Sequence, residues 1–383
     1  MPLRATVPCL LLVACAGVQT DDTDGDVWRG TDTGDSGEPA LPLADLTFEA
    51  EALGADELNP HGDGSGRVRL TASADDAVRY VFLVEGSAPV EREDGVLEVT
   101  LTEEGLLDHT FAVLAFAADG ASAREERTMK VQVGSDGRRL IFADEFDRDG
   151  AVDPSKWLAQ HRPPLDGGWF NGELQHYTER LDNAWVSDGT LKIRARRERY
   201  TVEGSARDFT SARLNARFAF AYGRVEVRAK LPSAAGAWPA IWTLGANVNE
   251  LGNPFGTTYG NVGWPACGEV DILEQVGWDK QHTIAHFHWA DTRTGEYAHE
   301  GGELRVPTST TAFHVYALEW DAERLEVFVD DDLVWSMPND AGRPYDNPHY
   351  LLLNVAVGGN LGGDVPASFD EAVMEVDWVR IYE

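Results

Sequence analysis

The sequence WPACGEVDILE spans residues 264–274. Its last six residues alternate three carboxylates with Val, Ile and Leu. Val, Ile and Leu are typical of a buried strand, in which positions i and i+2 share a face, so Glu269 and Asp271 point the same way. Glu274 would point to the opposite face of a regular strand. A β-bulge near Ile272-Leu273 adds one residue and turns Glu274 back beside the other two. The segment therefore predicts three acids on one concave surface.

Neighbouring carboxylates can divide the work of a glycosidase. Two carboxyl groups on one face can lie ~5–5.5 Å apart, the separation at which retaining glycosidases place a nucleophile and a proton donor. Like charges disfavour a second ionisation, so the neighbours raise the pKa of the donor and keep it protonated near neutral pH. The alternative interpretation of this segment is an acidic edge strand with solvated side chains.

Strand-like runs without helical periodicity surround this segment. They are TLKIRAR (190–196), RVEVRAKL (224–231), FHVYALEW (313–320), RLEVFVD (324–330), YLLLNVAV (350–357) and MEVDWVRIY (374–382). Gly and Pro separate them, as expected of turns between strands. Residues 139–383 are therefore predicted to form one all-β domain, a large antiparallel sandwich or jelly roll.

A second set of short strands precedes the large domain. Residues 43–134 contain RVRLTAS, VRYVFLVEG, VLEVTLTEE, HTFAVLAFA and TMKVQV, separated by turn residues. This spacing predicts a small β-sandwich. The pattern resembles the immunoglobulin-like or PKD-type modules that are attached to secreted bacterial enzymes. The domain contains no Trp, and we expect it to act as a spacer rather than to bind glycans.

The amino terminus reads as an export signal. Residues 1–15, MPLRATVPCLLLVAC, contain one Arg and an apolar run that is too short to span a membrane but fits a signal-peptide core. The run ends in LVAC, which resembles a bacterial lipobox and makes Cys15 the lipidated first residue of the mature chain. The alternative is an ordinary signal cleaved near Ala16. Residues 16–42 are rich in Asp, Gly and Thr and predict a disordered acidic linker. We expect an exported protein, either a lipoprotein anchored to a membrane of the bacterial cell envelope or a secreted enzyme.

The amino-acid composition limits the classes of molecule that this protein could bind. Among 383 residues, 65 acidic and 32 basic side chains give a net charge of −33, which repels phosphate backbones and excludes a nucleic-acid partner. The same charge argues against sulfated polysaccharides. Twelve Trp residues suit a large β core or a sugar-binding surface. Three Cys residues are too few for a fold that depends on several disulfides. Separately, we expect the protein to be a monomer.

Several further segments, in their order along the chain, resemble the motifs of a known protein family. They are Asp144-Glu145-Phe146, NGELQHYT (171–178), TSAR (210–213), YGRVEV (222–227), WPAIW (238–242), WPACGEVDILE, LNVAVGG (353–359) and MEVDWV (374–379). Together they resemble glycoside hydrolase family 16, specifically its laminarinase-like members, across residues 139–383. The resemblance implies a β-jelly roll that cleaves β-1,3 or β-1,4 links with retention. It also implies that Glu269 is the nucleophile, Asp271 the assisting acid and Glu274 the general acid/base.

The same resemblance assigns substrate contacts. It places Trp242 against the sugar at the cleavage point, with Trp238 nearby, and the alternative for each is a core position. Asn171 and Arg213 resemble residues that hydrogen-bond sugars on the non-reducing side, and the alternative for Arg213 is a surface salt bridge. His288 resembles a histidine close to the acid/base. Trp264, Trp278 and Trp289 flank the acids and are candidates for the walls of the groove, and the alternative for each is a core position.

No cofactor is expected for catalysis. His286 and His288 share a strand face but lack a third zinc ligand nearby, and Cys267 reads as a buried, inert thiol. The resemblance implies a structural calcium ion far from the acids, and the matching positions are Glu145, Gly189 and Asp377. One departure is Leu361, where the family often has Trp.

The sequence therefore predicts a retaining endo-hydrolase that cleaves β-1,3 links in laminarin-like or mixed-linkage β-glucans. One alternative is a glucan-binding protein without turnover, which would be expected to lose one or both glutamates, and Glu269 and Glu274 are both present. The other is the same fold acting on a different polymer such as agarose, or transferring sugars instead of hydrolysing them.

Overall fold

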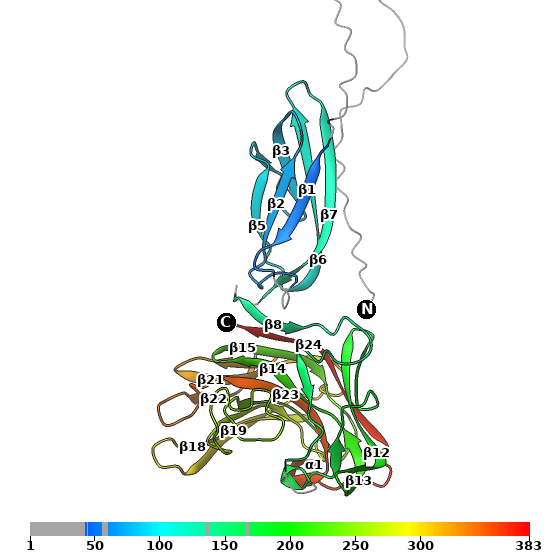
Figure 1. Cartoon of the computed structure of the whole chain (residues 1–383), viewed down its shortest axis with the longest axis vertical. Helices are drawn as coiled ribbons and strands as arrows, with labels where there is room; N and C mark the ends of the chain where they lie inside the picture. The colour runs from blue at the N-terminus through cyan, green and yellow to red at the C-terminus, as the bar shows by residue number, and fades with distance from the viewer. Residues whose placement is uncertain (1–42, 44, 56–59, 135–137, 165–167) are drawn as a thin grey trace, which may run out of the picture. The chain divides into compact units, whose positions relative to one another are not determined.

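The computed structural model describes residues 43, 45–55, 60–134, 138–164 and 168–383 (Figure 1). The predicted signal segment, the lipidation site Cys15 and the acidic linker lie outside these residues. Within the described part of the chain, no helix has the length and apolar character needed to cross a membrane.

The described residues between 43 and 134 form two antiparallel sheets. One has the strand order β1-β2-β5 and the other β4-β3-β6-β7. The strands are β1 (Thr47–Ala52), β2 (Arg67–Ser73), β3 (Ala77–Val84), β4 (Val90–Arg92), β5 (Val96–Thr100), β6 (Gly105–Ala117) and β7 (Ser122–Val133). Strand β2 alternates strictly between exposed and buried residues, and its inward side chains join one apolar cluster with Phe82 and Phe111. The small domain is thus a packed β structure, and its immunoglobulin-like or PKD-type class stays a prediction.

The large domain contains a seven-stranded antiparallel sheet in the order β19-β18-β17-β16-β23-β14-β9. Its strands are β19 (Tyr297–Arg305), β18 (His282–Ala290), β17 (Glu269–Glu274), β16 (Ala237–Gly245), β23 (His349–Val357), β14 (Arg213–Phe220) and β9 (Trp157–Ala159). The acid-rich segment is β17, near the middle of this sheet. Its neighbours, β16 and β18, are therefore the strands that determine the surroundings of the acids.

A ten-stranded sheet completes the large domain. Its main path is β10-β13-β12-β24-β15-β20-β21-β22, while β11 pairs with β12 and β8 with β24. The strands are β10 (Gln175–Tyr177), β13 (Ser205–Ser211), β12 (Thr190–Val202), β24 (Glu371–Tyr382), β15 (Gly223–Lys230), β20 (His314–Trp320), β21 (Arg324–Val329), β22 (Asp332–Pro338), β11 (Ala184–Ser187) and β8 (Leu140–Asp144). All pairs are antiparallel except β10 with β13. The predicted all-β, largely antiparallel fold is confirmed.

The core forms from side chains of both sheets. In β18, Thr283, Ala285, Phe287 and Trp289 are buried and alternate with more exposed residues, as the period of two in a strand requires. Phe287 and Trp289 join residues of β15, β20 and β24 in one apolar cluster. Trp289 is therefore a core residue. The other face of the seven-stranded sheet, which carries the acids, is called the acid-bearing face below.

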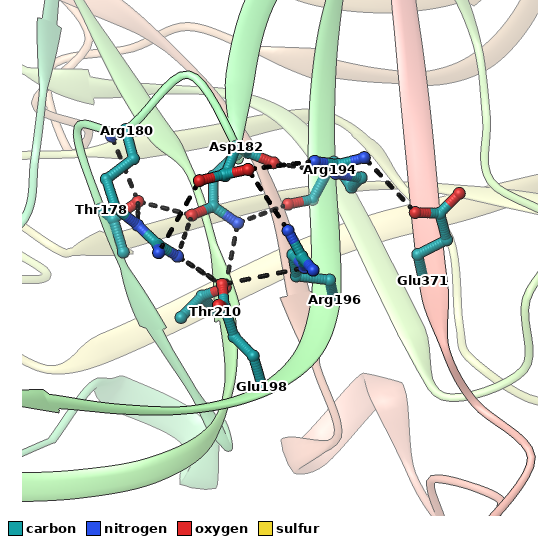
Figure 2. A network of polar contacts seen from close by, with 9 residues as sticks. Thr178, Arg180, Asp182, Arg194, Arg196, Glu198, Thr210 and Glu371 are labelled. Carbon is teal, nitrogen blue, oxygen red and sulfur yellow. Dashed lines mark hydrogen bonds and ion pairs between the residues drawn. The ribbon is translucent and has the colours of Figure 1, made fainter.

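A polar network holds the loop between β10 and β11 against the ten-stranded sheet (Figure 2). Buried Asn183 lies at its centre, accepting a 2.6 Å hydrogen bond from Thr178 and donating to Thr210 at 3.0 Å. Arg180 and Glu198 form an ion pair beside it. Further members are Asp182, Arg194, Arg196 and Glu371. The network fixes the loop directly after β10, whose residue Tyr177 reaches the acid-bearing face.

Candidate active site

Strand β17 contains the predicted bulge. On the β16 side, Ile241 pairs with Leu273 and Trp242 with Asp271, which leaves Ile272 without a partner. The ladder with β18 shifts between Asp271 and Glu274 as well. As a result, Val270, Ile272 and Leu273 all enter the core cluster. The three acids are left together on the opposite, acid-bearing face.

Each of the three acids has a ring nitrogen as a neighbour. The indole Nε1 of Trp264 donates to Glu269 Oε2 at 3.0 Å, and the indole Nε1 of Trp238 donates to Glu274 Oε1 at 2.9 Å. His288 Nε2 lies 3.4 Å from Asp271 Oδ2. The two glutamates are thus held by separate donors at opposite ends of the strand. The contact of His288 is with the central aspartate.

Burial raises the pKa of all three acids. For Glu269, burial acts first and the charge of Asp271 adds to it, while His288 lowers the pKa. For Glu274, burial and Asp271 raise the pKa and the hydrogen bond from Trp238 lowers it. Burial alone raises the pKa of Asp271. Because the groups are coupled, they titrate as a set, and at neutral pH the site retains protons. A site of this kind can supply a proton donor and a carboxylate nucleophile together.

We expect the variant Trp238→Phe to shift the alkaline limb of the pH–rate profile to higher pH. The indole N–H stabilises ionised Glu274, so its loss raises the pKa of that acid further and keeps it protonated to higher pH. The measurement is kcat against pH on a soluble β-glucan. Trp335→Phe is the matched control, because within the described residues the Nε1 of Trp335 has no hydrogen-bond partner. An unchanged or downward-shifted limb in Trp238→Phe contradicts the expected role of this bond.

The predicted sugar contacts on β14 and β16 lie beyond Glu274. Register aligns Arg213 with Asn354 of β23, Asn354 with Ala240, and Ala240 with Glu274, so one row crosses four strands. Arg213 is 4% exposed and forms a 2.8 Å ion pair with Glu250. The salt bridge considered for Arg213 therefore exists, but it is buried rather than at the surface. Its partner Glu250, in the loop after β16, carried no signal in the sequence.

Trp242 is held from two directions. Its Nε1 donates to Asn354 Oδ1 at 2.7 Å, and the Arg213 guanidinium lies 4.8 Å from the centre of its ring. Trp242 keeps partial exposure, whereas Trp238 is buried and reaches the site through its hydrogen bond to Glu274. Trp238 is therefore buried, as the alternative of a core position predicts, but it also contacts the site by donating a hydrogen bond to Glu274.

A chain of buried hydrogen bonds continues from Asn354, the residue that accepts the hydrogen bond of the Trp242 indole. Asn354 Nδ2 donates to the Tyr177 hydroxyl at 3.0 Å, and that hydroxyl donates to Glu173 Oε2 at 3.0 Å. Gln175 also donates to Glu173, at 2.6 Å. Burial raises the pKa of Glu173. Neither Glu173 nor Tyr177 is predicted as a site residue from the sequence, although both belong to the NGELQHYT motif, two and six residues after Asn171.

Asn171 is exposed in a single 3₁₀ turn, Phe170–Gly172, where it has a left-handed φ of 57°. The turn approaches the short helix α1 (Gly359–Gly362), and Asn360 Nδ2 donates to Asn171 Oδ1 at 3.5 Å. A Cβ on Gly359 would lie 2.7 Å from the carbonyl oxygen of Asn171, so this close approach requires glycine there. Asn171 is placed at the surface, and its contacts are with α1 rather than with the acids.

The predicted calcium positions are committed to other partners. Arg380 donates to both carboxylate oxygens of Glu145, at 2.9 and 3.0 Å, and Arg228 pairs with Asp377. Gly189 lies in a turn with a φ of 69°. In this arrangement each of the two carboxylates is paired with an arginine, and no step below involves calcium. Calcium binding stays a prediction that rests on the resemblance alone.

Among the described residues, the side chains grouped closely enough to hold a metal ion are Glu269, Asp271 and His288, whose ligand atoms lie within 4.8 Å of one another. They are the acids of the site and their neighbour, so the grouping follows from the crowding already described. Cys267 is fully buried, and burial raises the pKa of its thiol to about 12. The prediction of a buried Cys267 is confirmed, and its thiol is poorly suited to nucleophilic chemistry.

Comparison with known proteins gives one matching family model. Residues 175–380 match the glycosyl hydrolases family 16. The chain is 43% identical to a β-glucanase of Rhodothermus marinus over 63% of this chain and 84% of that protein. It is 33% identical to the glucan endo-1,3-β-glucosidase A1 of Niallia circulans over 64% of this chain, but it spans only 38% of that longer protein.

The fold is similar to a solved structure as well. The LamAcat structure from Zobellia galactanivorans is 60% identical, with a TM-score of 0.63, and the match covers 64% of this chain and 97% of that one. A LamA variant from the same organism was solved in complex with laminaritriose and laminaritetraose, with the same identity and TM-score and 98% of that chain covered.

Proposed function

Because the chain belongs to glycosyl hydrolases family 16, we propose that it is a retaining endo-hydrolase of β-1,3 links in laminarin-like or mixed-linkage β-glucans. The observation that carries this proposal is the bulge in β17, which brings Glu274 to the same face as Glu269. The likeness to a β-glucanase and to LamA, a variant of which was solved with laminari-oligosaccharides, supports the choice of β-glucan. The jelly-roll architecture is shared with these relatives.

The first step of the proposed reaction forms a glycosyl-enzyme. The Glu269 carboxylate attacks the anomeric carbon, the bond to the leaving sugar breaks, and Glu274 gives its proton to the departing oxygen. Burial raises the pKa of both glutamates and keeps Glu274 protonated until the proton is needed, so the division of roles rests on the resemblance rather than on burial. The hydrogen bond from Trp264 stabilises the ionised form of Glu269, as a nucleophile requires.

The second step releases the sugar. The Glu274 carboxylate takes a proton from water, and the resulting hydroxide attacks the anomeric carbon as the bond to Glu269 breaks. Two inversions at one carbon restore the β configuration. Asp271 lies between the glutamates along β17 and next to His288. Because three crowded acids do not all ionise together, Asp271 can hold the proton that remains on the site.

The testing experiment incubates the purified protein with laminarin, mixed-linkage β-glucan, agarose and carrageenan, and identifies the oligosaccharides released. We expect internal cleavage of the two glucans, with proton NMR showing β-anomers first. Release of α-anomers contradicts the retaining mechanism. Cleavage of agarose or carrageenan alone contradicts the substrate class, and tight glucan binding without any product contradicts enzymatic function.

We further propose an exported lipoprotein attached to the cell envelope through Cys15, with residues 16–42 as a tether, residues 43–134 as a spacer and residues 139–383 as the catalytic domain. A monomer suffices, because one chain supplies every site residue described above. Cys15→Ser is expected to remove fatty-acid labelling of the full chain expressed in a bacterial host and to move the protein from the membrane to the soluble fraction. Cys9→Ser is the control. Persistent labelling of Cys15→Ser, or labelling lost equally in Cys9→Ser, contradicts the anchor.

A further inference from the structure

A row of rings continues from the acids to the edge of the seven-stranded sheet. Register pairs Glu269 of β17 with His288 of β18, and His288 with His299 of β19. The next row contains Asp271, His286 and Gly301. Tyr297 lies two residues before His299 on β19, so it shares the acid-bearing face. Four rings of β18 and β19 thus lie beside the acids.

These four rings pack against one another. His286 stacks on His288 with 4.6 Å between ring centres, and Tyr297 lies almost parallel to His288, with an interplanar angle of 6°. His286 Nε2 and His299 Nδ1 are hydrogen-bonded at 3.0 Å, and His288 Nδ1 and the Tyr297 hydroxyl at 2.7 Å. These bonds fix the orientation of all four rings.

Gly301 leaves room for this packing. A Cβ added to Gly301 would lie 2.4 Å from the carbonyl oxygen of Ala285 and 3.0 Å from His286 Cγ, so a larger residue opposite His286 would clash with both the backbone and the imidazole. Burial and the neighbouring His288 and His299 lower the pKa of His286 to about 4. The imidazole of His286 is therefore neutral near pH 7, which suits contact with an uncharged sugar.

The outer part of this ring cluster faces solvent. Tyr297 is 51% exposed, and Trp264, whose ring centre lies 5.6 Å from that of Tyr297, is 52% exposed. Trp264 in turn donates its hydrogen bond to Glu269. Exposed ring faces thus begin at the proposed nucleophile and continue onto β19. Flat rings of this kind cover the apolar C–H face of a pyranose, while imidazole and hydroxyl groups bond its oxygens.

The cluster lies on the side of β17 opposite to Arg213 and Trp242. In the sheet order, β16, β23 and β14 lie on one side of β17, and β18 and β19 lie on the other. An endo-acting enzyme must hold its polymer on both sides of the bond that it cuts. If the residues of β14 and β16 hold the non-reducing side, the remaining glucosyl units must cross β18 and β19.

We propose that Tyr297, His299 and His286 form the subsite that binds the glucosyl units on the reducing-end side of the cleaved bond. This inference rests on the proposed function, since it assigns the second half of that same substrate. The subsite receives the leaving sugar in the first step. It also holds any sugar that replaces water as the acceptor in the second step, so it sets the balance between hydrolysis and transfer.

The test compares reactions with and without a sugar in this subsite. 4-Nitrophenyl β-laminaribioside is the donor, and laminaribiose is the added acceptor. In Tyr297→Ala we expect the transfer product to fall about three- to tenfold relative to hydrolysis, the size of one aromatic contact. Transfer and hydrolysis draw on the same glycosyl-enzyme, so their ratio is unaffected by any change in the rate of nitrophenolate release. Tyr297→Phe keeps the ring and should retain most of the transfer, while Leu181→Ala, an exposed residue outside the site, is the control.

Binding provides a readout that does not depend on turnover. In the Glu269→Gln background, Tyr297→Ala should weaken the calorimetric affinity for laminarihexaose by a similar factor. Loss of this binding supports the subsite even if the wild-type protein shows no hydrolysis, in which case only the proposed function fails. Unchanged transfer and unchanged binding overturn the inference. Equal loss in Tyr297→Phe and Tyr297→Ala also overturns it, because the ring itself would then contribute nothing.

Discussion

Replacing Glu269 with Gln is expected to lower kcat on laminarin by about 10⁴-fold or more, as loss of a covalent nucleophile does in other hydrolases. The amide has nearly the shape of the carboxylate but cannot attack the anomeric carbon. It can still accept the hydrogen bond from Trp264, so the local structure should persist. The measurement pairs initial rates of reducing-end release with calorimetric binding of laminarihexaose, which should remain within a few-fold of wild type.

The control for this variant is Glu323→Gln, which makes the same change at an exposed turn between β20 and β21. It should retain full activity. Reducing-end release at the native rate by Glu269→Gln would show that the covalent mechanism is wrong. Loss of activity together with loss of the folding transition would mean that Glu269 supports the fold instead, so thermal unfolding is recorded for every variant.

Replacing Glu274 with Ala is expected to lower kcat on laminarin by about 10²–10⁴-fold, the usual contribution of a general acid. The effect should depend on the leaving group. A nitrophenolate departs without a proton, so formation of the glycosyl-enzyme from 4-nitrophenyl β-laminaribioside should be nearly normal in pre-steady-state measurements. Water attack in the second step also needs Glu274, so a burst of nitrophenolate followed by slow turnover is expected.

Added azide sharpens this second prediction. Azide needs no general base, so it should restore the slow second step of Glu274→Ala and yield a β-glycosyl azide. It should not restore Glu269→Gln, in which no glycosyl-enzyme forms. Equal loss on laminarin and on the nitrophenyl substrate, without a burst and without azide rescue, would assign Glu274 to a structural role.

The central feature of the site followed from the sequence because strand periodicity is local. Side chains alternate along any strand, so the spacing of Glu269, Asp271 and Glu274 required one extra residue if all three were to act together. The structure places that bulge at Ile272, within the predicted pair. The all-β fold followed from the same alternation, repeated in short runs between turns.

Other contacts could not be read from local spacing. Glu250, the partner of Arg213, lies in a loop with no motif, and the chain from Trp242 through Asn354 to Tyr177 joins strands far apart in sequence. The resemblance named Arg213 and Trp242 but not these partners. It also named Glu145 and Asp377 for calcium, whereas the structure pairs both with arginines of other strands.

The sequence by itself determined which side chains of one strand share a face, because that depends only on backbone geometry within the strand. The tertiary structure decided which strands lie next to each other and in what register. That choice aligned Glu269, His288 and His299 in one row and brought Tyr297 beside them. Register depends on packing of the whole core, since a slip of one residue would turn every inward side chain of a strand to solvent.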